Sequence, residues 1–155
     1  MRLSFGNGSP SNMRLFRFVI LLWAGLVLSA CTDYDVGTAD TPANREGFVR
    51  HLGFQPGEQV VSVYYYADEF GADVRYQLSF ECPPEIAEKI VAELSLRPGS
   101  EDDLRLYPRD DLEWWKPGAT EGLPRWSTEG GDGQHRREFW YSETDGRAYY
   151  HEYSN

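Results

Sequence analysis

The residues that most often carry catalysis are not spaced for it in this sequence. Its three histidines, His51, His135 and His151, include no pair at the i, i+4 spacing that presents two zinc ligands on one helix face. No serine lies in the Gly-x-Ser-x-Gly elbow that joins a strand to a helix in many serine hydrolases. We therefore interpret the histidines as surface groups, exposed or hydrogen-bonded, and predict no catalytic residue.

Two acidic clusters raise the question of a cation or a sugar substrate. Glu101-Asp102-Asp103 and Asp110-Asp111 hold enough carboxylate oxygens for Ca²⁺, but they lack the alternating Asp spacing with glycine of an EF-hand. Glycoside hydrolysis needs two carboxyl groups facing each other across a sugar cleft, and the sequence marks no such pair. We predict no metal site and no cofactor, and a glycan hydrolase stays the weaker alternative.

Aromatic residues are concentrated in a long irregular segment, 100–133, and in the strands that follow it. Alternation along those strands sends neighbouring rings to opposite faces of a sheet, so some rings point away from the core unless the segment covers them. Two interpretations stay open. In the favoured one the segment packs its tryptophans on the sheet; in the other, exposed rings form a platform for a sugar ring or a protein partner. The candidate binding residues are Trp114, Trp115, Trp126, Trp140 and Tyr150.

The N-terminal segment has the layout of a secretory signal. Arg14 and Arg17 supply a positive region, and residues 18–27 form an apolar core. Met13 would serve as the start of a more compact leader. The apolar stretch 15–30 includes Arg17 and is shorter than the roughly 20 apolar residues that span a bilayer, so an uncleaved membrane helix is disfavoured.

The end of this leader, Leu28-Ser29-Ala30-Cys31, resembles the lipobox of bacterial lipoproteins. The resemblance implies cleavage between Ala30 and Cys31 and a diacylglycerol on the Cys31 thiol, and it favours this processing over plain secretion. Proteins of this type carry at least two acyl chains, which anchor them stably. Because Thr32 rather than aspartate follows the cysteine, the resemblance favours the outer over the inner membrane where the host has both. We expect a membrane-anchored, extracytoplasmic protein.

Removal of the leader makes the chain strongly acidic. All 25 acidic residues follow Cys31, whereas three of the 15 basic residues precede it, so the remaining 12 leave a formal charge of −13. Phosphates of nucleic acids and anionic lipid headgroups would repel such a surface. We therefore expect no nucleic-acid partner, attachment to the membrane by the lipid alone, and an envelope protein or glycan as the partner of the domain.

The second cysteine, Cys82, lies between an alternating strand and the start of a helix. We interpret it as a small buried hydrophobe rather than a nucleophile, because no histidine lies near it in the sequence to act as a base. A Cys31–Cys82 disulfide stays open for a chain that is not lipidated.

Local signals predict a helix and then a pair of strands. Thr41 is suited to cap the helix, Pro42 to occupy its first turn and Gly53 to end it. Strands follow at 60–66 and 74–81. Along the second strand apolar and polar residues alternate strictly, which sends one set to the core and the other to water. The set predicted to face water is Arg75, Gln77, Ser79 and Glu81.

A second helix and a final hairpin complete the expected domain. Pro83-Pro84 opens the helix and Arg97-Pro98-Gly99 ends it, while strands at 138–142 and 147–153 flank a turn with Gly146 in a left-handed position. The fold class is α+β: a single small domain with an antiparallel sheet of about four strands, from two hairpins, and one or two helices on one face. The boundaries are 1–30 for the signal peptide, 31–41 for the lipidated cysteine and a flexible tether, and 42–155 for the domain.

The order of these elements resembles small uncharacterised bacterial lipoproteins. The similar segments are Phe48–Pro56, Val60–Phe80, Pro83-Pro84-Glu85, Trp114-Trp115-Lys116-Pro117 and Phe139–Tyr153. The resemblance brings no known activity. We expect a noncatalytic envelope lipoprotein that binds a protein or contributes structurally, and the alternative is a module that binds cell-wall carbohydrate through its loop tryptophans.

Overall fold

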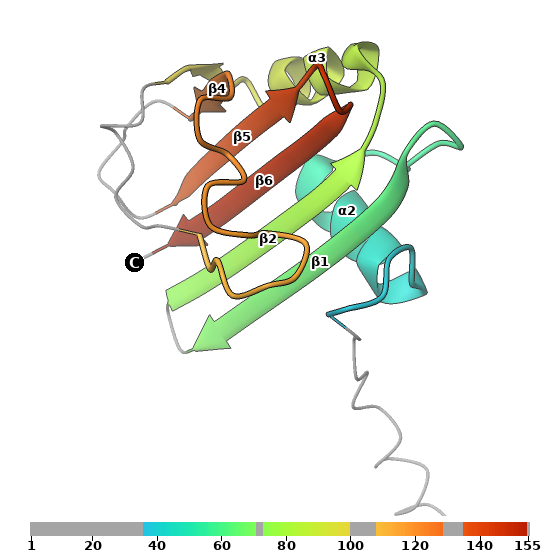
Figure 1. Cartoon of the computed structure of the whole chain (residues 1–155). Coiled ribbons are helices and arrows are strands. Elements are labelled where there is room, and N and C mark those ends of the chain that lie inside the picture. Colours follow the sequence, from blue (N-terminus) through green and yellow to red (C-terminus); the bar gives the residue numbers. More distant parts are fainter. Residues whose placement is uncertain (1–35, 71–72, 100–107, 129–134, 155) are drawn as a thin grey trace, which may run out of the picture. The chain divides into compact units, whose positions relative to one another are not determined.

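The structure is a computed structural model that describes residues 36–70, 73–99, 108–128 and 135–154. Within these ranges six strands form one antiparallel sheet in the order β1-β2-β6-β5-β4-β3, with two helices behind it in Figure 1. No described helix is long and apolar enough to cross a bilayer. The elements are α2 (Pro42–Leu52), β1 (Val61–Phe70), β2 (Asp73–Glu81), α3 (Pro84–Glu93), β3 (Arg97–Pro98), β4 (Arg125–Ser127), β5 (Arg136–Ser142) and β6 (Arg147–Ser154).

The α+β class and the antiparallel sheet are as predicted, but the predicted number of about four strands is too low. The additional strands β3 and β4 have only 2 and 3 residues, too few to show a periodic pattern in sequence. They form because β4 pairs with β5, where Trp126 lies opposite Phe139, and β3 pairs with β4. Accordingly α3 ends at Glu93, and Arg97-Pro98 belongs to the sheet rather than to the end of the helix.

Helix α2 begins and ends where its local signals predict. The Thr41 side chain accepts a hydrogen bond from the backbone N–H of Asn44, and Gly53 ends the helix with φ of 82°. Gly47 lies inside the helix because a side chain would not fit there: a Cβ atom would come within 2.6 Å of the Tyr65 ring. The loss of helix propensity at this glycine is thus offset by close contact between α2 and β1.

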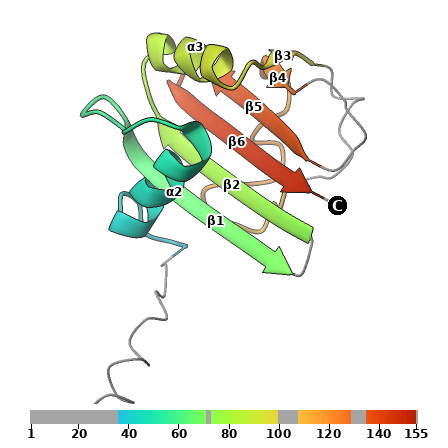
Figure 2. The same cartoon turned by 180° about the vertical axis from the view of Figure 1, so that it is seen from behind.

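The larger core lies between the two helices and the sheet, on the face shown in Figure 2. Leu78 and Phe80 point into it from β2, as their alternation predicts, and neither is exposed to solvent. The final hairpin, β5 and β6, also contributes side chains to this core. Gly146 in its turn has a φ of 64°, which the turn requires. The fully buried apolar residues of this core include Phe48, Val60, Val63, Leu78, Phe80, Ile90, Phe139, Ala148 and Tyr150.

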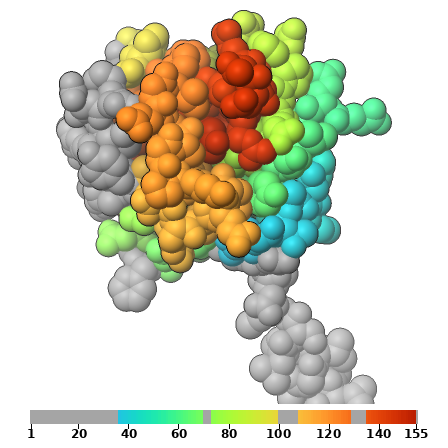
Figure 3. Space-filling model, viewed as in Figure 1, coloured from blue at the N-terminus to red at the C-terminus, as the bar shows by residue number. Residues whose placement is uncertain are grey.

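The opposite face of the sheet is covered as well, which corrects one prediction. Gln77 and Ser79 were expected to face water, but both are fully buried. Segment 108–124 lies over this face and is the orange band in the space-filling view (Figure 3). The Gln77 amide forms two hydrogen bonds with the backbone of this segment. Gln77 Nε2 donates to the Arg109 carbonyl oxygen at 2.9 Å, and Gln77 Oε1 accepts from the Arg109 N–H at 2.9 Å. A polar side chain is buried here at low cost because it is fully hydrogen-bonded to a segment distant in sequence.

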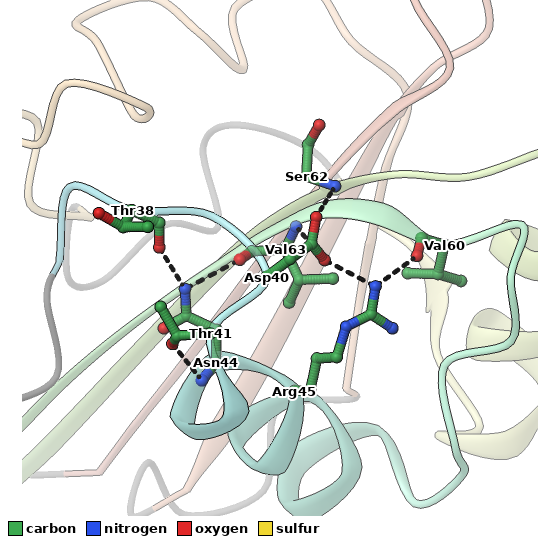
Figure 4. A network of polar contacts seen from close by, with 8 residues as sticks. All are labelled: Thr38, Asp40, Thr41, Asn44, Arg45, Val60, Ser62 and Val63. Carbon is green, nitrogen blue, oxygen red and sulfur yellow. Dashed lines mark hydrogen bonds and ion pairs between the residues drawn. The ribbon is translucent and has the colours of Figure 1, made fainter. Parts of the chain in front are cut away.

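Residues 36–41, which we call the strap, are attached to the domain although 31–41 was predicted to be a flexible tether. The strap runs beside an irregularity in β1, where the register with β2 shifts between Val61 and Tyr64. In Figure 4 the Asp40 carboxylate lies against this irregularity, accepting from the backbone N–H of Ser62 at 2.8 Å and of Val63 at 3.3 Å. The strap therefore supplies hydrogen-bond partners to the edge strand. Residues 31–35 of the predicted tether lie outside the described residues.

Replacing Asp40 with alanine is expected to lower the free energy of unfolding by about 1–3 kcal/mol. The change removes both acceptor oxygens and places alanine at a φ of 58°, a left-handed conformation that aspartate and asparagine tolerate better. Amide hydrogen exchange at Ser62 and Val63 and urea unfolding measure the effect. Asp40→Asn is the control, because it keeps one acceptor and the backbone preference and should lose less. Equal stability of the alanine variant and the natural chain would contradict this role of the strap.

Candidate functional site

Three of the five candidate binding residues lie in a second core between segment 108–124 and the sheet. Trp114, Trp115 and Trp140 are 8 %, 2 % and 1 % exposed. The Trp115 ring meets the rings of Trp140 and Tyr149 edge-on, at centroid distances of 6.1 and 5.1 Å, and the indole N–H of Trp114 donates to the Val36 carbonyl oxygen at 2.7 Å. The packing interpretation is confirmed for these residues, and they form no exposed platform.

The other two candidates lie on the helix-covered face. Tyr150 is fully buried, and its hydroxyl donates to Glu152 at 2.6 Å. Trp126 is partly buried, and its ring is 6.0 Å from that of Phe139. The five aromatic residues are therefore divided between two faces of the sheet and make no common surface. Of the five, Trp126 borders an open groove.

This groove lies between α3 and the sheet, with a volume of about 490 Å³. Small residues of α3 form one wall, and aromatic residues of β4 and β5 line the sheet side. The volume and the mainly apolar lining are typical of sites that bind a small ligand or a few side chains of a partner. No pattern in the sequence predicts the groove, because its wall and its floor come from elements that meet only in the fold. Its apolar lining includes Ala87, Val91, Ala92, Trp126, Phe139 and Tyr141.

The groove has an acidic border. Glu88 and Glu143 line it, and Arg97 is the basic residue of its lining. Burial raises the pKa of the Tyr141 phenol, and the nearby charges of Glu143 and Glu85 add to the increase. Among the described residues, neither Glu85 nor either lining glutamate forms an ion pair. Their negative charge is therefore not neutralised within the described part of the chain.

Cys82 is buried, as predicted, and it forms no disulfide within the described residues. Burial raises the pKa of its thiol to about 12, so the reactive thiolate is not formed at neutral pH. Its backbone carbonyl accepts a hydrogen bond from the Tyr141 hydroxyl at 3.0 Å, which fixes the floor of the groove. Cys31, the other cysteine, lies outside the described residues.

A buried polar cluster joins α2 to β6 and contradicts the prediction of a surface position for His51. This histidine is 8 % exposed. Its Nδ1 is 2.8 Å from a carboxylate oxygen of Glu152, and its Nε2 is 3.1 Å from the Tyr65 hydroxyl. Its ring lies 4.2 Å from that of Tyr76. Both ring nitrogens of His51 are occupied, so the geometry is that of a structural contact between helix and sheet.

Glu152 is the centre of this cluster. Burial raises its pKa, but hydrogen bonds with His51 and Tyr150 and the charges of His51 and Arg137 outweigh that effect and lower the pKa to about 2. His135, which is exposed as predicted, places its Nε2 2.6 Å from the second carboxylate oxygen. Glu152 thus remains ionised at neutral pH, and its carboxylate is contacted both by His51 of the helix layer and by Tyr150 of the sheet.

A second buried cluster lies on the sheet face opposite the helices. Arg125 Nη2 and Glu138 Oε1 are 2.6 Å apart, and their side chains are 2 % and 0 % exposed. His151 is fully buried, with Nδ1 3.3 Å from the other carboxylate oxygen, so the prediction of a surface position is wrong here also. Arg136 Nε lies 3.3 Å from Glu138 Oε1. The cluster is invisible in sequence because β4, β5 and β6 each contribute only one or two members.

The stability of the protein is expected to fall as the pH decreases below about 6.5. Burial lowers the pKa of His151 from its usual 6.5, an effect only partly opposed by Glu138. Below this pH the unfolded chain binds a proton that the folded chain does not, so stability decreases by at most about 1.4 kcal/mol per pH unit. Urea unfolding between neutral and mildly acidic pH measures the slope. His151→Gln should flatten it in that range, whereas an unchanged slope would assign the effect to another group.

The acidic clusters provide no cation site in the described part of the chain. No group of three or more potential metal-ligating side chains comes together there. Asp110 is exposed, and Asp111 forms an ion pair with Arg109. Residues 101–103 of the other cluster lie outside the described residues.

Comparisons with known proteins give no relative. The chain matches no protein-family model, no curated protein and no solved structure.

Proposed function

We propose that this protein is a noncatalytic lipoprotein of the cell envelope whose domain binds another protein through the groove beside α3. The observation that carries the proposal is the groove itself, which combines an aromatic and aliphatic lining with carboxylates that have no described ion-pair partner. Aromatic residues at the bottom of a concave surface contribute strongly to protein binding. Partly exposed Trp126 supports this use of the surface.

The proposed anchor is the lipidated thiol of Cys31. It is supported by the leader and by the Leu28-Ser29-Ala30-Cys31 motif. The mature charge of −13, left when the 12 remaining basic residues are set against 25 acidic ones, supports attachment through lipid rather than through electrostatic attraction to headgroups. Because Thr32 rather than aspartate follows Cys31, we place the protein on the outer membrane of a host with two membranes, facing away from the cytoplasm.

The noncatalytic part of the proposal is supported by how the titratable side chains are used. His51 and Glu152 are saturated by contacts between α2, β1 and β6, and His151 and Glu138 face each other in a closed interior. The glycan-binding alternative needs at least two exposed indoles on one side of the protein. Burial of Trp114, Trp115 and Trp140 leaves it without support.

The test has two parts, one for the anchor and one for the groove. Cys31→Ala should lose incorporation of a labelled fatty acid and leave the membrane fraction, and its retention there with label would contradict the anchor. A photo-crosslinking residue at Ala92, on the wall of the groove, should capture one defined envelope protein in living cells. The same residue at exposed Glu113, in the segment over the other face, is the matched control. Equal products from both positions, or none from Ala92, would contradict the groove as the interface.

A further inference from the structure

The border of the groove indicates which partner it fits. Three carboxylates, Glu85, Glu88 and Glu143, lie at or beside the groove, against one basic lining residue, Arg97. Lys89 of α3 does not line the groove, and its ammonium lies 4.1 Å from the centre of the Phe54 ring. The groove therefore offers an apolar floor with a local excess of negative charge.

An apolar groove with this border favours a ligand that is apolar at its centre and positively charged at its ends. A second copy of the chain is a poor occupant, because each mature copy carries −13, from 12 basic and 25 acidic residues, and like charges repel. The volume of about 490 Å³ accommodates one or two large side chains rather than a folded element. A short segment of polypeptide meets these requirements.

The position of the groove also bears on the partner. The strap enters the domain at β1, at one end of the strand order, whereas the groove lies over β4 and β5 toward the other end. Three strand spacings, about 14 Å, separate β1 from β5. A partner in the groove therefore lies away from the edge strand that the strap contacts.

We propose that the groove binds a short segment of an envelope protein that places a leucine or aromatic side chain between lysine or arginine residues. This inference rests on the proposed function, since it names the chemistry of the partner that the groove would hold. The apolar side chain would contact the partly exposed Trp126 and Val91, and the flanking cations would lie beside Glu88 and Glu143. Because these charge contacts are at the surface, salt should weaken the binding.

The test uses the lipidated mature protein in detergent, labelled with 5-fluorotryptophan. Trp23 is removed with the leader, so four resonances remain from the five tryptophans of the sequence, and single Trp→Phe variants assign them. The probes are three capped peptides, Lys-Leu-Phe-Lys, Ser-Leu-Phe-Ser and Glu-Leu-Phe-Glu. We expect the basic peptide to shift the Trp126 resonance saturably, to leave those of buried Trp115 and Trp140 in place, and to bind less tightly at high salt.

Variants separate charge from shape. The double variant Glu88→Lys, Glu143→Lys should weaken binding of the basic peptide about tenfold, whereas Glu113→Lys, with a reversed charge on the other face, should leave it unchanged. The proposal is overturned if the three peptides bind equally, if the double variant binds as the natural chain does, or if no peptide at millimolar concentration moves the Trp126 resonance. A Trp126 shift on dilution of the protein alone would assign the groove to a second copy and also overturn it. Capture from Ala92 in cells together with failure of the peptides would refute the partner chemistry and keep the proposed function.

Discussion

Replacement of Glu138 with alanine is expected to lower the free energy of unfolding by about 3–5 kcal/mol, a large part of the stability of an ordinary domain. The Glu138 carboxylate is fully buried and is the shared partner of Arg125 and His151. Its removal leaves the Arg125 guanidinium charged in an interior where its side chain is 2 % exposed, and no other described acid takes its place. The large effect comes from the uncompensated charge rather than from the net contribution of the ion pair.

Urea unfolding followed by far-ultraviolet circular dichroism measures this loss. Glu138→Gln keeps the shape and an acceptor oxygen, so it should be destabilised less than the alanine variant but still measurably, because the charge is gone. Glu113→Ala is the matched control, since Glu113 is exposed, and it should change stability by less than about 0.5 kcal/mol. If the Glu138→Ala and Glu113→Ala variants unfold at the same urea concentration, the buried cluster does not stabilise the fold.

The second large effect is expected at Trp115, where replacement with alanine should cost about 3–5 kcal/mol. Trp115 is 2 % exposed and packs edge-on against both Trp140 and Tyr149. It is the centre of the contact between segment 108–124 and the sheet. Its loss should therefore also release the segment from Gln77, whose amide is bound to the Arg109 backbone.

Amide hydrogen exchange distinguishes this effect from general destabilisation. In Trp115→Ala, exchange at Arg109 should increase far more than exchange at the helix-covered core, because the cover opens before the sheet unfolds. Trp126→Ala is the control: Trp126 is only partly buried and lies on the other face, so it should cost less and leave Arg109 protected. Equal exchange at Arg109 in the two variants would show that Trp115 does not hold the segment in place.

The elements that the sequence predicts well are those set by neighbours in the chain. The Thr41 cap of α2 depends on a contact over 3 residues, to Asn44, and the turn at Gly146 joins strands only four residues apart. The alternation of β2 correctly places Leu78 and Phe80 in the core. Such features are decided by backbone sterics and periodicity, which any short window of the sequence contains.

The errors at Gln77 and Ser79 share one cause, which is a cover that comes from far along the chain. Gln77 and Ser79 were expected in water because polar residues of an alternating strand usually face it, yet segment 108–124 covers them. The Gln77 amide and the Arg109 backbone that satisfies it are 32 residues apart. His151 lies opposite Gln77 in the β2–β6 register and is fully buried as well. Composition offers one sign of this, because three tryptophans in 100–133 need a surface to pack on.

The sequence alone determines the local helices and hairpins and the acidic composition of the chain after Cys31, because these follow from residue identity and near-neighbour geometry. The motif that ends at Cys31, on which the proposed anchor depends, is local in the same way. Tertiary structure alone decides which polar side chains are buried and where a groove opens. His51 meets Glu152 across 101 residues, and the wall of the groove on α3 meets a floor on β4 and β5. Those contacts depend on strand order and register, which are selected by the packing of the whole domain.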